Sequence, residues 1–183
     1  IEHVHGHHKN VGLFHDPATA RRGEFIYSFI IRSIIGEHKN AFKIEKKRLQ
    51  KQNHQWLSLQ NRYLRGLLYT AIIFSITFVV SGISGVGYMF IAMLWAKILL
   101  EAVNYIEHYG LIRVAGKAIR PRHSWNSNKW LSSALLFNLT RHSAHHEKAT
   151  LEFWELSPYQ DAPEMPFGYL ASVYFALIFP FTY

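Results

Sequence analysis

Histidines gather in two short stretches of this 183-residue sequence, EHVHGHH near its start and RHSAHH around residue 142. Each stretch holds a closely spaced triplet: His3, His7 and His8 in the first, and His142, His145 and His146 in the second. Residues three and four apart share a face of a helix, so each triplet is predicted to present its imidazoles to one point. Neutral imidazole binds iron, copper, zinc and nickel, and the two triplets therefore predict a metal site.

A seventh candidate ligand, His108, lies within the segment EAVNYIEHYGL, which also carries two glutamates. Glu101, Asn104 and His108 fall at i, i+3 and i+7, which places them on one helical face. Glu101 and Glu107 are expected either to solvate the end of this helix or to orient a liganding imidazole through its free N–H. Seven histidines exceed what one metal ion can use, so we predict two metal ions.

The elements that must position these histidines include one long uncharged run. No charged residue occurs between Arg65 and Lys97, which is too long for a soluble strand or an ordinary buried helix. Its middle, SGISGVG, has the composition of a turn. We therefore predict two short membrane helices, about 64–80 and 86–103, packed as a hairpin, with a hydrophobic core helix as the alternative.

The placement of charge predicts how this hairpin is oriented. Both of its ends face one side, and every Lys and Arg of the chain, whose net charge is +8, lies on that side. Such an excess marks the cytoplasmic side of a membrane protein. The basic run over residues 39–51 is predicted to be solvated or to face membrane lipid. Nucleic acid is excluded as a partner, because the sequence shows no recognition module.

The sequence contains no Cys, which excludes thiolate metal sites and any iron–sulfur cluster held by this chain. Electrons for redox chemistry must therefore arrive from another molecule. The predicted fold class is all-α, with multi-pass membrane helices and a cytoplasmic site lined by histidines.

The histidine motifs, taken in order, resemble those of the integral-membrane alkane hydroxylases, the alkane 1-monooxygenases. EHVHGHH matches the box E-H-x-x-x-H-H, NYIEHYGL matches N-Y-x-E-H-Y-G-L, and LTRHSAHH matches R-H-S-x-H-H. The segments DPATARRGE and HSWNSN are also similar to that family, so the resemblance spans nearly the whole chain. The family is related to xylene monooxygenase and to the membrane fatty acid desaturases.

The resemblance implies a non-haem di-iron enzyme that uses O2 to hydroxylate the terminal methyl group of an alkane, giving a 1-alcohol. The matched iron ligands are His3, His7, His8, His108, His142, His145 and His146. His123, in HSWNSN, matches a family position outside the ligand boxes and is expected to support a ligand. Rubredoxin and rubredoxin reductase would deliver electrons, and the enzyme would lie in the bacterial inner membrane with its active site facing the cytoplasm.

The sequence departs from the family pattern in two places. An earlier box of the form H-E-x-x-H is absent, so residues 1–183 are expected to form a partial catalytic domain, the C-terminal part of the fold, that is inactive alone. Ala144 stands where the last box usually carries Asp. FWELSPYQDAPEMPFGY and GEFIYSFIIRS are similar to xylene monooxygenase, so a xylene-type methyl hydroxylase, or a desaturase on the same metal site, is the alternative function.

Two further sets of residues follow from the position of His108. Continuing its face up the helix leads to Leu94 and Phe90, which are expected to line either a substrate channel or an ordinary helix contact. A small acidic electron carrier would dock on a basic surface, and the loop after His108 is favoured because it directly follows a ligand. The basic residues of that loop are Arg113, Lys117, Arg120 and Arg122.

A protein of a different class, a membrane protein that binds or transports metal, is the remaining alternative. Transporters place their ligands near the bilayer midplane, on broken helices. None of the histidines lies inside the uncharged run, which argues against transport.

Overall fold

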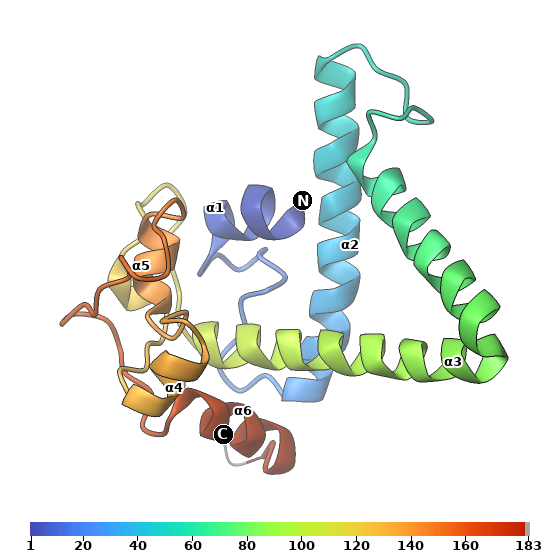
Figure 1. Ribbon diagram of the computed structural model, residues 1–183. Helices are drawn as coiled ribbons and strands as arrows, with labels where there is room; N and C mark the ends of the chain where they lie inside the picture. The colour runs from blue at the N-terminus through green and yellow to red at the C-terminus, as the bar shows by residue number, and fades with distance from the viewer. Residues whose placement is uncertain (182–183) are drawn as a thin grey trace.

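The computed structural model describes residues 1–181 and is built from helices (Figure 1). The elements in chain order are η1 (His3–His7), α1 (His8–Asn10), α2 (Ile26–Lys51), α3 (Arg62–His108), η2 (Pro121–His123), α4 (Trp130–Leu135), α5 (His142–Glu147) and α6 (Tyr169–Ile178). Strand pairing among the described residues is limited to one isolated bridge, between Asn126 and Glu164. The predicted all-α class is therefore confirmed. The last two residues of the predicted domain, Thr182 and Tyr183, lie outside the described residues.

Helix α3 is 47 residues long and bends sharply at Gly82, which has φ 62° and ψ −163°. Figure 1 shows the two limbs, 62–81 and 83–108, diverging from this bend. The predicted hairpin placed a turn of several residues here, whereas the structure turns the chain at a single glycine. Glycine suffices because it lacks the Cβ that forbids this conformation to other residues.

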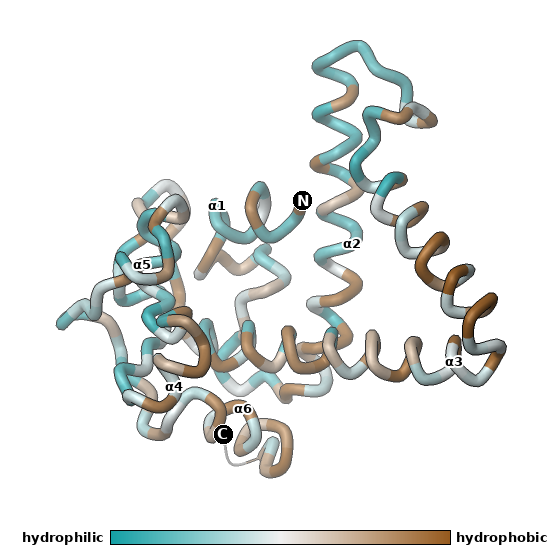
Figure 2. The backbone as a smooth tube through the Cα atoms, in the orientation of Figure 1, coloured by the Kyte–Doolittle hydropathy of each residue, from teal (hydrophilic) through white to brown (hydrophobic). Residues whose placement is uncertain are grey.

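Helix α3 is also the one helix of the described residues that is long and apolar enough to cross a membrane. Figure 2 shows hydrophobic residues along this helix. None of its most apolar stretch is buried, whereas the core helix of a soluble protein would be mostly buried. Its first limb begins at a polar cap, where the Asn61 side chain accepts a hydrogen bond of 3.1 Å from the Leu64 amide.

The packed core lies where α2, the last turns of α3 and α6 meet. Phe29 of α2 packs edge to face on Tyr105 of α3, with ring centroids 5.4 Å apart, and both are buried. Tyr169 and Val173 bring α6 onto the same cluster. The polar tip of Tyr105 is satisfied by the Glu24 carbonyl at 2.7 Å. This core fixes the end of α3, and with it His108, against the rest of the chain.

The bend at Gly82 gives the first prediction. The Gly82→Ala variant should lower the free energy of unfolding by about 1–3 kcal/mol, because alanine is strained at this positive φ. The measurement is the thermal midpoint of the detergent-purified protein. Gly87→Ala is the matched control, since Gly87 lies in the second limb with open space around it, and it should be neutral or stabilising. Equal midpoints for the two variants would contradict the need for glycine at the bend.

Candidate metal centre

The structure brings the seven predicted histidines together in two adjacent groups, each with ligand atoms within 4.8 Å of one another. The inner group is fully buried and consists of His7, His108, His142 and His146. The outer group is more accessible and consists of His3, His8 and His145. The rings of His8 and His146, one from each group, have centroids 4.8 Å apart, so the two groups share a wall.

The prediction that each sequence triplet serves one point is wrong. Each triplet instead divides between the groups, because neighbouring residues such as His145 and His146 point to different sides of a helix. In the first triplet the backbone forms a wide π-helical turn, η1, which aligns residues five apart. His3 and His8 thereby meet with their Nε2 atoms 3.1 Å apart, while His7 turns toward the inner group.

The inner histidines are held from behind by oxygen atoms. His7 Nδ1 donates to the Asp16 carboxylate at 2.8 Å, and His108 Nδ1 donates to the His123 carbonyl at 3.3 Å. Glu107 Oε1 lies 3.0 Å from His142 Nδ1. Carboxylate and carbonyl oxygens only accept hydrogen bonds, so the Nδ1 atoms of His7 and His108 carry the protons. Their Nε2 atoms therefore turn lone pairs inward.

This arrangement fits a metal ion. The Nε2 atoms of His142 and His146 lie 2.8 Å apart, and those of His142 and His108 lie 3.3 Å apart. His7 Nε2 is buried and has no hydrogen-bond partner among the described residues. Converging lone pairs in a buried pocket are costly unless a cation occupies their meeting point. Four converging imidazoles, two of them donating from Nδ1 to an oxygen atom behind the ring, are the expected surroundings of a bound metal.

Electrostatics keeps the imidazoles in the neutral form that metal binding requires. Burial holds the pKa values of His142 and His146 well below the usual range. Burial and the neighbouring His3 lower the pKa of His8 to about 3. Burial opposes the charge of Asp16, but hydrogen bonds from His7 and Thr19 outweigh it and hold the pKa of that carboxyl below its ordinary value. His8, His142 and His146 are therefore neutral and Asp16 is charged at neutral pH.

The predicted supporting residues fall into different places. Glu107 and the His123 backbone touch inner histidines, as described above. Glu101 is fully buried and pairs with Lys97, while Asn104 donates to it at 3.2 Å. Within residues 1–181 no hydrogen bond or ion pair joins Glu101 to a histidine, so the idea that it orients an imidazole finds no contact here.

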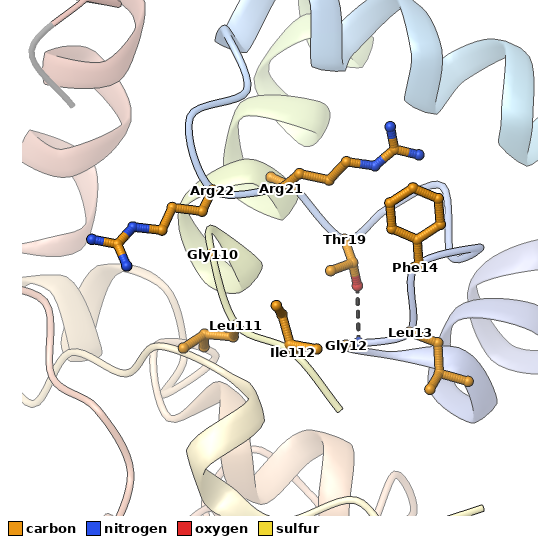
Figure 3. A pocket seen from close by; sticks show the side chains of 10 residues that line it. Gly12, Leu13, Phe14, Thr19, Arg21, Arg22, Gly110, Leu111 and Ile112 are labelled. Atoms are coloured by element: carbon orange, nitrogen blue, oxygen red, sulfur yellow. Dashed lines mark hydrogen bonds between the residues drawn. The ribbon is translucent and has the colours of Figure 1, made fainter. Parts of the chain in front are cut away.

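Asp16 is the supporting residue that sequence reasoning missed. It lies in the loop after α1, and Thr19 of the same loop donates to it at 2.6 Å. The Thr19 hydroxyl in turn accepts a hydrogen bond of 3.0 Å from the Gly12 amide (Figure 3). A sequence feature does point to Asp16: it is the first residue of DPATARRGE, one of the segments that are similar to the alkane hydroxylases.

The outer side of this loop lines a small apolar pocket of about 250 Å³. Figure 3 shows Phe14 and Ile112 at the pocket, with the side chains of Arg21 and Arg22 extending away from one another.

The loop after His108 differs from the predicted basic surface at one residue. Arg113 is buried, and its guanidinium donates to the carbonyls of Val11, Lys9 and Lys117 at 2.6–2.8 Å. Arg113 therefore joins this loop to the N-terminal segment that carries histidines. It is not part of an exposed docking surface, contrary to the prediction. The other three basic residues of the loop, Lys117, Arg120 and Arg122, are exposed.

Helix α5, which carries the second triplet, is held by hydrogen bonds to the preceding segment of the chain. The Ser143 hydroxyl donates to the Pro121 carbonyl at 2.7 Å, and the Ser143 amide donates to Asn126 Oδ1 at 2.9 Å. Ala144 beside it is fully buried. The place where the resembled family usually carries Asp is thus a packed apolar position in this chain.

These features define a helical metalloprotein whose histidine cage lies at the end of a membrane-length helix. The chain belongs to the fatty acid desaturase family, because the model described as "Fatty acid desaturase" matches residues 1–176. The relationship to that superfamily inferred from the motifs is confirmed.

Several curated proteins are similar over nearly the whole chain. Alkane 1-monooxygenase 1 of Alcanivorax borkumensis is 37% identical over 98% of this chain and 46% of its own length. Alkane 1-monooxygenase of Ectopseudomonas oleovorans is 37% identical over 97% of this chain and 46% of its own length. The xylene/toluene monooxygenase hydroxylase component XylM of Pseudomonas putida is 34% identical over 97% and 50%. The chain spans about half the length of the curated relatives it matches.

The His7–Asp16 contact gives the second prediction. Asp16→Asn keeps the size of the side chain but removes the charge that stabilises the protonated Nδ1 of His7, so metal affinity should fall about 10- to 100-fold. The measurement is metal per chain after competition with a chelator. Asp161→Asn, at an exposed position, is the control and should match the parent. Undiminished metal retention in Asp16→Asn would show that this carboxylate does not support the site.

Proposed function

We propose that this protein is the catalytic part of a membrane di-iron monooxygenase that hydroxylates the terminal methyl group of an alkane to a 1-alcohol. The observation that carries the proposal is the pair of adjacent histidine groups at the end of α3. Family membership and the alkane 1-monooxygenases among its relatives supply the reaction class.

The membrane placement follows from the two limbs of α3. At 1.5 Å per residue they measure about 30 and 39 Å, against a hydrocarbon core of about 30 Å. With the bend at Gly82 on one side of the bilayer, both outer ends return to the other side. The basic residues lie beyond those ends, which favours the cytoplasm for that side, and hence a multi-pass inner-membrane protein with its site facing the cytoplasm.

We assign one iron ion to each histidine group. The inner group offers four imidazoles, and the outer group offers three, which leaves coordination positions for small ligands. The chemistry that bound iron supplies is reduction of O2 by two electrons and insertion of one oxygen atom into a C–H bond, the other leaving as water. Asp16 and the His123 carbonyl keep His7 and His108 oriented, and the buried surroundings exclude water.

The substrate class fits an apolar cavity of about 610 Å³ between α2, α3 and α6. Leu94, predicted to line a channel, lies in its wall together with Ile98 and Trp95. Ile98 precedes His108 by ten residues, or about 15 Å of helix. Phe90 is half exposed and outside the wall, so its channel role stays a proposal without a contact to support it.

Rubredoxin, reduced by its reductase, is the proposed electron donor. The exposed Lys117, Arg120 and Arg122 follow the His108 helix and are flanked by exposed apolar residues, Ile112 and Val114. A small apolar patch with a charged rim suits a transient redox encounter.

A xylene-type methyl hydroxylase is the second candidate. The match to XylM favours it, and so does the aromatic part of the cavity wall, where Tyr27, Trp95 and Tyr174 contribute rings.

The third prediction tests the reaction. Membranes containing the full-length protein, supplied with reduced rubredoxin and O2, should convert octane or hexadecane to the 1-alcohol and hold about two iron ions per chain. His145→Ala should lose iron and reduce turnover roughly 100-fold or more, because an imidazole ligand is removed. His54→Ala, at an exposed histidine of neither group, is the control.

Xylene offered in parallel separates the candidates. Oxidation of xylene alone would replace the alkane assignment by the xylene-type one. Zinc in place of iron, with no O2 consumption, would instead favour a metal-binding membrane protein.

The fourth prediction tests the docking loop. Charge reversal in Arg120→Glu with Arg122→Glu should slow rubredoxin-dependent turnover about tenfold or more at low salt, because charge-steered association is lost. The difference in turnover rate between the parent and the variant should become smaller as salt rises, since the Debye length shrinks from about 10 Å at 0.1 M to about 3 Å at 1 M. The same reversal at Lys39 and Lys46 is the control. An unchanged rate and salt dependence in the first variant would exclude this loop.

A further inference from the structure

A second pocket, of about 500 Å³, lies beside α2, and five of its seven lining residues are Lys or Arg, the other two being His5 and Ile44. Its walls come from three segments: the N-terminal turn contributes His5 and Lys9, α2 contributes Lys47 and Lys51, and α3 contributes its first residue, Arg62. His5 is the histidine of the first stretch that joins neither metal group. No acidic residue lines the pocket among the described residues.

The charge of this pocket is available for a ligand. Arg48 also lines it, but its guanidinium is already bound to Glu45 at 2.6 Å, to the Gln52 side chain and to the Gln60 carbonyl. Within residues 1–181 no ion pair involves the remaining cations, Lys9, Lys47, Lys51 and Arg62. Four unpaired cations around one cavity favour an anion with several oxygen atoms, such as a phosphate group.

The pocket is also fixed in space by buried contacts below it. Glu45 accepts the Arg62 amide at 2.7 Å, which ties the start of α3 to α2. Hydrogen bonds from Arg48 lower the pKa of Glu45 to about 2, so this carboxylate stays charged throughout the neutral range. The cations of α2 and α3 therefore face a common space that does not depend on flexible surface chains alone.

The position of Arg62 favours a lipid with a phosphate group over a free phosphate compound as the ligand. It is the first residue of the membrane-length helix, and the residues that follow within two to three turns, Leu67, Leu68 and Ile72, are about half exposed. Figure 2 shows the change from the mainly hydrophilic end of α2 and the loop after it to the hydrophobic first limb of α3. A ligand with a phosphate group and acyl chains satisfies both surfaces at once. Anionic lipid is attracted to such basic segments beside a membrane.

We propose that the pocket of His5, Lys9, Lys47, Lys51 and Arg62 binds the phosphate headgroup of an anionic phospholipid, whose acyl chains lie along the first limb of α3. The proposal rests on the membrane placement of α3 given above and not on the hydroxylation reaction. It assigns a role to the basic end of α2 and places a lipid beside the π-helical turn that carries His3 and His7.

The test measures the thermal midpoint of the detergent-purified full-length protein during titration with short-chain phosphatidylglycerol, phosphatidylcholine or inorganic phosphate. Phosphatidylglycerol should bind at least tenfold more tightly than phosphatidylcholine, whose choline cation cancels the phosphate charge. In Lys47→Gln with Lys51→Gln, binding of phosphatidylglycerol should weaken roughly 30-fold, because two cations at the headgroup are lost. Arg62→Gln, on the other helix, should act in the same direction.

The matched control is Lys39→Gln with Lys46→Gln, which removes the same charge from the same helix outside the pocket. It should retain the preference for phosphatidylglycerol. An equal loss in the control would show general surface attraction and overturn the proposal, as would unchanged binding in the pocket variants. A full shift with inorganic phosphate alone would assign the pocket to a free phosphate compound and overturn the lipid. None of these readouts depends on turnover, so they remain informative if the hydroxylation assignment fails.

Discussion

The constraint on which this structure depends is the cost of facing several neutral imidazoles toward one another in a buried space. A ring that turns its Nε2 lone pair inward carries its proton on Nδ1, and an acceptor behind the ring stabilises this tautomer. Asp16 does this for His7, and the His123 carbonyl does it for His108. These two acceptors come from segments far apart in sequence, so the metal centre can form only when the loops that carry them are packed together.

The supporting acceptors explain why so much irregular chain surrounds the site. The loop that carries Asp16 is closed by Thr19 and by Arg113, whose guanidinium accepts no hydrogen bonds and donates to three carbonyls. Carbonyls at the ends of short helices and turns otherwise lack partners. Burying one arginine there satisfies them and joins the segment of the first histidine triplet to the segment after His108.

Much of the site and the helical class could be predicted from the sequence, because residue type and local spacing decide them. The clustering of the seven histidines follows from chemistry and helical periodicity, whereas the contact of Glu107 with His142 was one of two alternatives that the sequence left open. Their division into two groups did not follow, because the π-helical turn at His3–His7 changes which residues align. The contacts of Asp16 and Arg113 span 9 and about 100 residues, so their partners cannot be predicted from local spacing, although Asp16 begins the recognisable segment DPATARRGE. The bend at Gly82 was foreseen only as a turn, since composition does not reveal that one residue suffices.

Helix α3 changes its chemistry along its length, and this change explains where the metal centre lies. Between Arg65 and Lys97 it carries no charged residue and no histidine, which suits lipid or neighbouring helices but offers no ligand for a metal ion. From Lys97 onward polar residues occupy one face, and Lys97 bridges Glu101 to Glu37 of α2 at the transition. A buried carboxylate is tolerated there because it is paired, and the pairing fixes α3 against α2. Below that ion pair the opposite face packs into the core through Ala102 and Ile106. The helix therefore carries polar residues, and finally His108, only where the core packs against it, so the histidine groups form at its packed end and not along its exposed apolar stretch.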